Sequence, residues 1–247
     1  MLSFRSPRKY NPEKKKREAR PSCAAIVVQV VREKYSESKL VEIYSETVPR
    51  PAGEEFGLGH ELTRTVSNAL KALKVDPQSC FVWRDGISES SFETLASREI
   101  EGIRRGLQPE LKAEKPLAAI PSAAIAEKPL AKVPLSYIIC QKRIATKFLT
   151  FEVDGHKNYN GMYAAPSGTF VDGFQGPKYY TYYIQGRAPD NSTAKPVRYT
   201  VLQRDKELSK KEIPELTWAM CHDYPNWVCF YSLFSTCIVL CLFSSPC

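Results

Sequence analysis

The stretch that decides the fold of this chain is "CFVWRDGISES", residues 80–90, in which four apolar residues run straight into Arg84, Asp85 and Gly86. A short apolar run of this kind predicts a strand that is buried on both faces. Open α/β sheets bind ligands beyond the carboxyl ends of their strands, so Asp85 is a candidate site residue on position alone. A structural interpretation competes with this one: Arg84 and Asp85 only open a turn, and Gly86 supplies the backbone freedom.

The segments on either side of this stretch alternate between strand and helix patterns. Residues 22–31 and 135–143 are apolar runs that predict buried strands, and residues 39–48 alternate between apolar and polar in the manner of a strand. Residues 54–73 and 89–107 carry apolar residues at helical spacing. The order strand, strand, helix, strand, helix, strand predicts an α/β layer fold.

The later part of the chain continues the same alternation. Residues 178–186 are rich in aromatics that suit a pleated surface, and residues 196–205 predict one further strand. Residues 209–224 predict a helix, because Ser209 and Glu212 are spaced as a capping-box pair.

Residues 108–134 interrupt the pattern. They contain the hexapeptide "AEKPLA" twice, at 113–118 and 126–131, and are rich in proline and alanine. Each proline removes a backbone donor, so neither a helix nor an inner strand is expected. We therefore predict a flexible, exposed inserted loop.

Positive charge is concentrated at the amino-terminal end. The chain carries a net charge of +8, and residues 1–20 hold eight Lys/Arg against two Glu, which is +6 of that total. This balance favours acidic partners, nucleic acid first and an anionic membrane second. We expect residues 1–20 to be a disordered basic arm, whose "KKKR" run is a solvated terminus, a nuclear address or a nucleic-acid-binding arm.

The cysteines indicate a reducing compartment. The chain has eight, with no CxxC pair and no amino-terminal secretory signal, so a zinc site is not expected. Cys23, Cys80 and Cys140 lie in apolar, strand-like runs and are expected to be buried small hydrophobes. We expect a cytoplasmic protein, or a nuclear one if the basic arm is an address.

Several segments, in the same order along the chain, resemble the Piwi domain of the Argonaute/Piwi family. They are "RPSCAAIVVQV" (20–30), "FVWRDGISES" (81–90), "YIICQKRIATKF" (137–148), "PSGTFVD" (166–172), "KPVRYTVLQRD" (195–205) and "LTWAMCHDY" (216–224). The resemblance implies an RNase H-like fold, a mixed sheet flanked by helices. It predicts a partial Piwi domain over 21–226, incomplete because the basic arm stands where the family has its first strand.

The resemblance also bears on catalysis. Family slicers cut target RNA with two divalent metals held by acidic residues and a final His or Asp, and Asp85 matches one of them. Glu54 or, preferably, Glu55 matches the glutamate, but residues 1–75 contain no Asp, and beyond Asp223 there is no Asp, Glu or His. We therefore expect Asp85 to be a vestigial metal ligand, with no cofactor and no enzyme activity. The alternative is a guide-directed RNA endonuclease completed by other carboxylates with Mg²⁺ or Mn²⁺.

Other matching residues imply contact with RNA. Five of them stand at family positions that face the guide: Lys142, Arg143, Lys147, Lys195 and Tyr224. Where the family commonly has two histidines after Q-K-R, this chain has Ile144 and Ala145. The competing interpretation is that the basic residues are ordinary solvated charges. The resemblance predicts binding of a small guide RNA or of target backbone in gene silencing, with silencing-complex proteins as possible partners.

The last segment is apolar. Residues 227–243, "WVCFYSLFSTCIVLCLF", are uncharged and unlike the family. They could be a buried element, or a tail anchor at the short limit of a bilayer span. The interpretation we favour from the sequence is a non-family tail over 227–247. A membrane-tethered or non-functional Piwi fragment therefore remains an alternative function.

Overall fold

The structure is a computed structural model, and it describes part of the chain. The described residues are 10–11, 16–17, 22–32, 40–50, 58–85, 87–108, 133–153, 159–172, 178–186, 195–205, 211–222 and 238–244. Three helices lie within them: α1 (Gly59–Leu73), α2 (Phe92–Leu107) and α3 (Glu212–Met220), with a 3-10 turn, η1 (Glu89–Ser91), before α2.

One mixed sheet forms the centre of the molecule. Its eight strands are β3 (Ser22–Arg32), β4 (Leu40–Arg50), β5 (Pro77–Asp85), β6 (Leu135–Gln141), β9 (Phe170–Asp172), β10 (Tyr180–Ile184), β11 (Val197–Arg204) and β12 (Ile238–Ser244). They are ordered β4-β3-β12-β5-β6-β11-β10-β9 across the sheet. β5 and β6 are parallel, whereas β3 and β4 form an antiparallel pair. The predicted α/β class and RNase H-like mixed sheet are confirmed.

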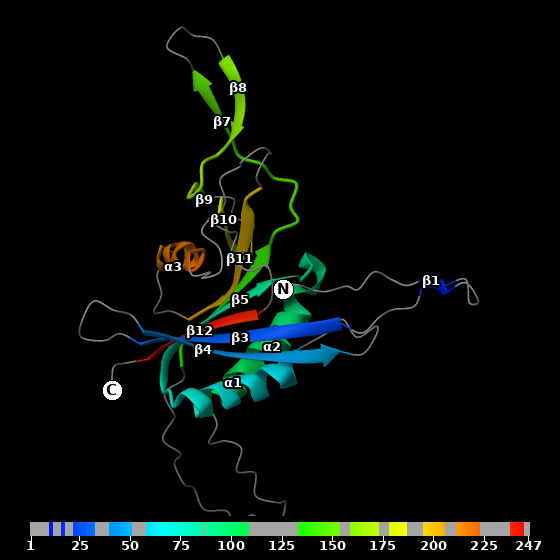
Figure 1. Cartoon of the computed structure of the whole chain (residues 1–247), viewed down its shortest axis with the longest axis vertical. Coiled ribbons are helices and arrows are strands. Elements are labelled where there is room, and N and C mark those ends of the chain that lie inside the picture. The colour runs from blue at the N-terminus through cyan, green and yellow to red at the C-terminus, as the bar shows by residue number, and fades with distance from the viewer. Residues whose placement is uncertain are drawn as a thin grey trace, which may run out of the picture.

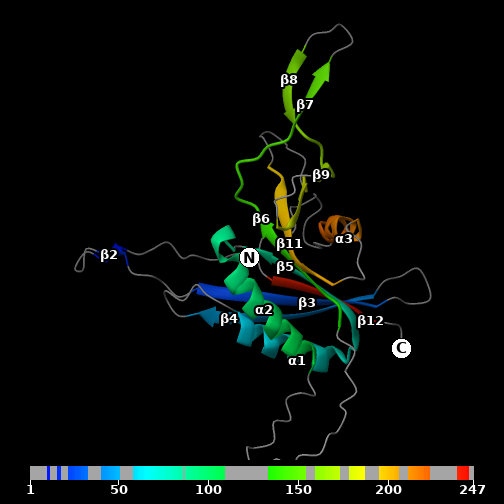
Figure 2. The same ribbon diagram turned by 180° about the vertical axis from the view of Figure 1, so that it is seen from behind.

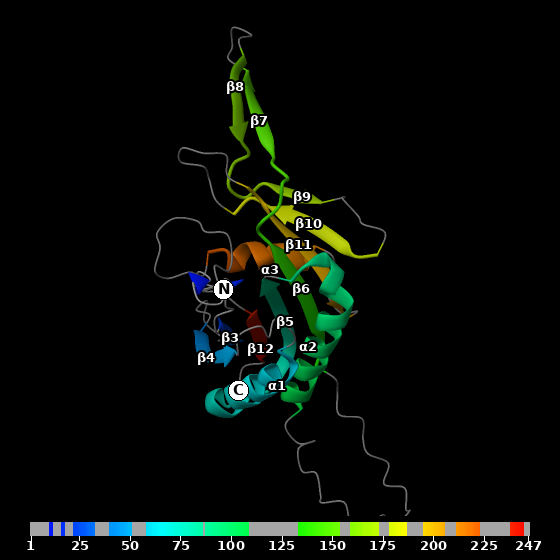
Figure 3. The same cartoon turned by 90° about the vertical axis from the view of Figure 1, so that its right-hand side faces the viewer.

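Helices cover both faces of this sheet. α1 and α2 lie side by side on one face, as Figure 1 and the reverse view in Figure 2 show, and α3 lies on the opposite face (Figure 3). The α1–α2 face is one apolar cluster that includes Leu62, Val66 and Ile103, and the α3 face is a second that includes Trp83 and Ile213. The chain therefore forms three layers, with a hydrophobic core on each side of the sheet.

The apolar tail contributes a central strand. β12 runs parallel to β3 and antiparallel to β5, and Figure 1 shows it in red between them. Leu240 and Leu242 pack into the α1–α2 core, while Val239 and Cys241 pack into the α3 core. Our favoured interpretation of this segment as a non-family tail is therefore wrong for residues 238–244. The uncharged run suits a position with no solvent on either face.

Two helices approach each other unusually closely through glycine. A Cβ added to Gly102 of α2 would lie 2.1 Å from the carbonyl oxygen of Gly59 in α1. Thr63 fixes this contact, because its Oγ1 lies 2.9 Å from the Gly59 carbonyl oxygen and 2.8 Å from the Gly102 carbonyl oxygen. The α1–α2 layer is thus set by the absence of a side chain at Gly102.

Several local predictions need correction. β3 is fully buried on one face only, since Ala24 and Ile26 are buried but Cys23 is exposed. The cap of α3 is Lys211, with no side-chain hydrogen bond, and Ser209 lies outside the described residues. Cys80 and Cys140 are buried, as predicted.

Two hairpins lie outside the main sheet. In the basic arm, β1 (Tyr10–Asn11) pairs with β2 (Lys16–Arg17), so the prediction of disorder over 1–20 is wrong for these four residues. β7 (Leu149–Val153) and β8 (Tyr159–Ala164) form the second hairpin, which the sequence did not indicate and which extends away from the sheet (Figures 1–3). Within the described ranges, no helix is long and apolar enough to cross a bilayer. Between Gln108 and Val133, the predicted insertion lies outside the described residues.

Candidate nucleic-acid interface

Arg84 explains why the apolar strand β5 ends on a charged pair. Its side chain is buried against α2, where its Nε and Nη2 donate to the two carboxylate oxygens of Glu99 at 3.0 and 3.2 Å. Tyr137 of β6 donates its hydroxyl to the same carboxylate at 2.5 Å. Burial disfavours the charged form and is the largest single effect, but the charge and hydrogen bond of Glu99, together with the neighbouring Tyr137 and Asp85, outweigh it, so the pKa of Arg84 is raised. Arg84 is therefore a structural anchor, not a surface charge.

This anchor also holds the backbone at the end of the strand. Nη1 of Arg84 donates to the carbonyl oxygen of Asp85 at 2.6 Å. The guanidinium of Arg84 thus links the carbonyl group of Asp85, at the end of β5, to the buried carboxylate of Glu99 on α2. Asp85 is consequently held at a defined place on the sheet edge.

The carboxylate of Asp85 has a cationic partner. Its Oδ2 lies 3.2 Å from Nζ of Lys142, and the two side chains are 17% and 23% exposed. The register explains the contact, because Asp85 stands opposite Cys140 on the parallel strand β6, and Lys142 follows two residues later on the same face. Asp85 and Lys142, for which different roles were predicted from the sequence, are therefore partners in the structure.

Strand directions bring the other basic residues to this edge. β6 ends at Gln141, just before Lys142 and Arg143, and β11 begins next to it, because Arg198 stands opposite Gln141 in the antiparallel ladder. Lys195 precedes β11 and so belongs to the same edge. The carboxyl ends of β5 and β6 and the amino end of β11 thus share one rim.

Lys147 lies near the same rim, because its neighbour Phe148 packs against β10. The ring of Phe148 meets the ring of Tyr183 at a centroid distance of 5.6 Å. Tyr183 on β10 stands opposite Arg198. Arg143, Lys147 and Lys195 are exposed and make no ion pair with any residue that the structure describes. Three cations are thus available to an anionic ligand along this rim.

Arg198 is a rim residue that sequence reasoning missed. It forms an ion pair with Glu89 of η1, and its buried Nε has no hydrogen-bond partner among the described residues. The Oε1 atom of Gln141, opposite it in register, is likewise buried with no partner in the described part of the chain. Alternation along β11 could have placed Arg198 on the α2 face, but nothing in the sequence indicated Glu89 as its partner.

The described residues near Asp85 do not fit a pair of divalent metals. No group of three or more His, Cys, Asp or Glu side chains close enough to hold a metal lies in the described ranges. On one side of β5, the neighbouring strand β12 places Ile238 opposite Arg84. On the other side, β6 places Cys140 opposite Asp85. Burial, and then the charge of Asp85, raises the pKa of the Cys140 thiol.

The remaining predicted site residues cannot be placed. Glu54, Glu55 and Tyr224 lie outside the described residues. Their proposed roles as a metal ligand and as a guide-facing ring therefore stay predictions.

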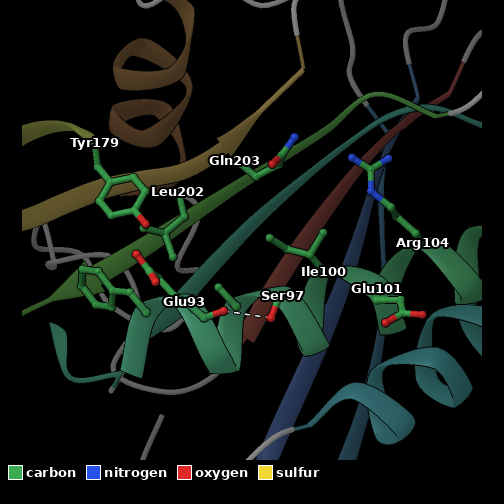
Figure 4. A pocket seen from close by; sticks show the side chains of 10 residues that line it. Glu93, Ser97, Ile100, Glu101, Arg104, Tyr179, Leu202 and Gln203 are labelled. Atoms are coloured by element: carbon green, nitrogen blue, oxygen red, sulfur yellow. Dashed lines mark hydrogen bonds between the residues drawn. The ribbon is translucent and has the colours of Figure 1, made fainter. Parts of the chain in front are cut away.

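A hollow elsewhere on the molecule has a different character. It has a volume of about 420 Å³ and lies between α2, the strand β11 and Tyr179, which precedes β10, with Ile100 and Leu202 facing each other across it (Figure 4). Glu93, Glu101 and Arg104 contribute charged groups to its lining, and Glu93 is paired with Lys178 and Glu101 with Arg105. None of the predicted site residues lines it.

Comparison with known proteins places this geometry in a family. A sequence model described as the Piwi domain matches residues 10–240. The chain is 27% identical over 192 residues to Piwi-like protein 1 of Gallus gallus, covering 76% of this chain and 20% of that protein. It is 26% identical over 187 residues to Piwi-like protein Ago3 of Bombyx mori, covering 74% and 18%. The chain thus spans about a fifth of the length of these curated relatives.

Solved structures show the same fold. The C-terminal lobe of a budding yeast Argonaute matches with a TM-score of 0.60 and 14% identity, over 87% of this chain and 44% of that one. Drosophila Piwi matches with a TM-score of 0.54 and 20% identity, over 87% and 28%. Kluyveromyces polysporus Argonaute, solved with a guide RNA, matches with a TM-score of 0.54 and 15% identity, over 85% and 26%. With the family model matching most of its length, the chain belongs to the Piwi domain family.

Proposed function

We propose that this chain binds the sugar-phosphate backbone of RNA along the rim formed by β5, β6 and β11, and that it does so without cutting the RNA. The observation that carries the proposal is the set of exposed cations Arg143, Lys147 and Lys195, which make no ion pair with a described residue. Phosphate contacts position a nucleic acid without reading its sequence, so this rim would accept a guide or a target strand of any sequence.

The pairing of Asp85 supports the second half of the proposal. A two-metal mechanism needs several carboxylates to neutralise and position both cations. Asp85 instead has the ammonium group of Lys142 at 3.2 Å. A role in gene silencing, with RNA and silencing-complex proteins as partners, follows as a proposal from the family membership.

The salt dependence of RNA affinity tests the binding. If the three rim cations contact three phosphates of a single-stranded RNA, log Kobs should fall with log salt with a slope of about −2. Replacing Arg143, Lys147 and Lys195 together by alanine should bring the slope close to zero and weaken binding alike for unrelated RNA sequences.

Two controls separate the rim from charge in general. Alanine at the exposed residues Lys71, Arg98 and Arg204 removes the same charge from the helices and from the far end of β11, and should leave the slope near −2. Deleting residues 1–20 tests the basic arm. If the rim variant keeps the wild-type slope and the arm deletion abolishes it, the RNA binds the arm and this proposal is wrong.

A further inference from the structure

The ion pair between Asp85 and Lys142 divides the basic rim into two groups. Lys142 is 23% exposed and Asp85 is 17% exposed, with 3.2 Å between Nζ and Oδ2. The exposed residues Arg143, Lys147 and Lys195 make no such contact with a described residue. Lys142 is therefore the one residue of the predicted RNA-binding set whose charge is matched within the described structure.

The place of the pair in the sheet makes it persistent. Asp85 ends β5 and Lys142 follows β6, and these parallel strands are hydrogen-bonded up to the pair of Asp85 with Cys140. The Asp85 peptide is further held by Arg84, which is itself clamped to Glu99. The two hydrogen-bonded strands therefore hold the backbones of the two residues close together, and the pair forms without any rearrangement of the sheet.

A carboxylate and a phosphate compete for the same ammonium group. An ammonium that is already neutralised by a fixed carboxylate releases no condensed counterion from RNA when a phosphate approaches, and so contributes neither affinity nor salt dependence. A phosphate that approaches Lys142 also approaches the carboxylate of Asp85, whose negative charge repels it, and displacing Asp85 would leave a partly buried carboxylate without its partner.

We propose that Asp85 acts as an internal phosphate competitor, which withholds Lys142 from the RNA site and limits the number of phosphates that the rim contacts. The inference rests on the proposed function, because it concerns the same rim. It gives the family's acidic position a role that needs no metal: in this chain Asp85 weakens RNA binding.

The test is the substitution Asp85→Asn, which keeps the shape and removes the charge. It should tighten binding of a single-stranded RNA at least about threefold at low salt and steepen the log–log slope by about 0.7, the contribution of one added phosphate. In a Lys142→Met background the same substitution should change neither quantity. Asp172→Asn on β9, which also removes one carboxylate from the sheet, is the matched control and should leave RNA affinity as it was.

The outcomes separate the two proposals. If neither the wild type nor the rim alanine variant binds RNA, the proposed function fails. If the wild type binds and Asp85→Asn leaves its affinity and slope unchanged, only the competitor role is wrong. An equal gain in the Lys142→Met background would also overturn it, because the effect would then be general electrostatics.

A second substitution protects the test against misfolding of the Asp85 variant. Lys142→Met should weaken RNA binding less than Arg143→Met does, since only Arg143 is available in the wild type. Melting temperatures are measured for every variant. A larger loss of affinity from Lys142→Met than from Arg143→Met would contradict the inference.

Discussion

At the scale of single residues, the decisive feature is that two adjacent charged side chains, Arg84 and Asp85, have different partners and different degrees of burial. Arg84 turns inward to Glu99 and Tyr137, and Asp85 turns to the rim, where it meets Lys142. The sequence predicted that β5 ends in a charged pair and that Asp85 lies at the sheet edge. It could not show which side chain is buried, because Glu99 lies fifteen residues away on a helix whose orientation depends on tertiary packing.

The buried Tyr137 hydroxyl gives a prediction about stability and pH. Burial, and then the charge of Glu99, raises the pKa of Tyr137 well above the unfolded value of about 10. The folded chain therefore keeps a proton that the unfolded chain releases, so the free energy of unfolding falls as the pH rises above about 10. Tyr182 and Tyr199, whose pKa values burial also raises, act in the same direction.

We therefore expect Tyr137→Phe to have two effects. At pH 7 it should cost about 1.5–3 kcal/mol, because a hydrogen bond to a charged, buried carboxylate is lost. Above about pH 10 its free energy of unfolding should decline less steeply than that of the wild type, because one phenol with a raised pKa has been removed. Urea unfolding between pH 7 and about 11 measures both. Equal slopes for the two proteins in the alkaline range would contradict the assignment of Tyr137.

At the scale of elements, the periodicity of the sequence predicted where helices and strands lie along the chain, but it did not predict how they contact one another. The apolar spacing predicted both helices of the α1–α2 layer, and the observed helices lie inside those ranges. The close approach of Gly102 to Gly59 could not be predicted, because a glycine in a helical pattern indicates only a lower helix propensity. The β7–β8 hairpin was not predicted: β7 alternates between apolar and polar residues, but β8 does not, so the sequence pattern did not indicate a pair of strands.

The glycine contact gives the second prediction. Gly102→Ala would place a Cβ 2.1 Å from the backbone carbonyl oxygen of Gly59, which cannot move as a side chain can. The helices must separate, and we expect the free energy of unfolding to fall by about 3 kcal/mol or more, although alanine has the higher helix propensity. Ser97→Ala, on the exposed face of the same helix, is the control and should change stability little. A Gly102→Ala protein as stable as the wild type would show that the two helices pack less closely.

At the scale of the whole molecule, the sheet is completed by the segment that the sequence analysis set apart. β12 lies between β3 and β5 with buried residues on both faces. Its apolar, uncharged composition fits a central strand, a membrane span or an unrelated tail equally well, so composition alone could not decide. Only the pairing with β3 and β5, which are distant in sequence, distinguishes the first interpretation.

This topology predicts the effect of changing β12. Leu240 is fully buried in the α1–α2 core, and Leu240→Ala should cost about 2–5 kcal/mol and lower the melting temperature by several degrees. A chain ending at Tyr224 loses the whole strand and should fail to give a cooperative unfolding transition. A chain ending at Ser244 retains β12 and is the control. If the chain ending at Tyr224 melts like the full chain, β12 is not part of the core.

The central claim, that the rim holds RNA without cutting it, is tested most directly by a cleavage assay in which binding is followed in the same sample. The purified chain is incubated with a guide RNA, a labelled complementary target and Mg²⁺ or Mn²⁺, and bound and cleaved target are both quantified. We expect target that is retained and intact, because the carboxylate of Asp85 is paired with the ammonium group of Lys142. Guide-directed cleavage that disappears in the Asp85→Ala variant would contradict the account.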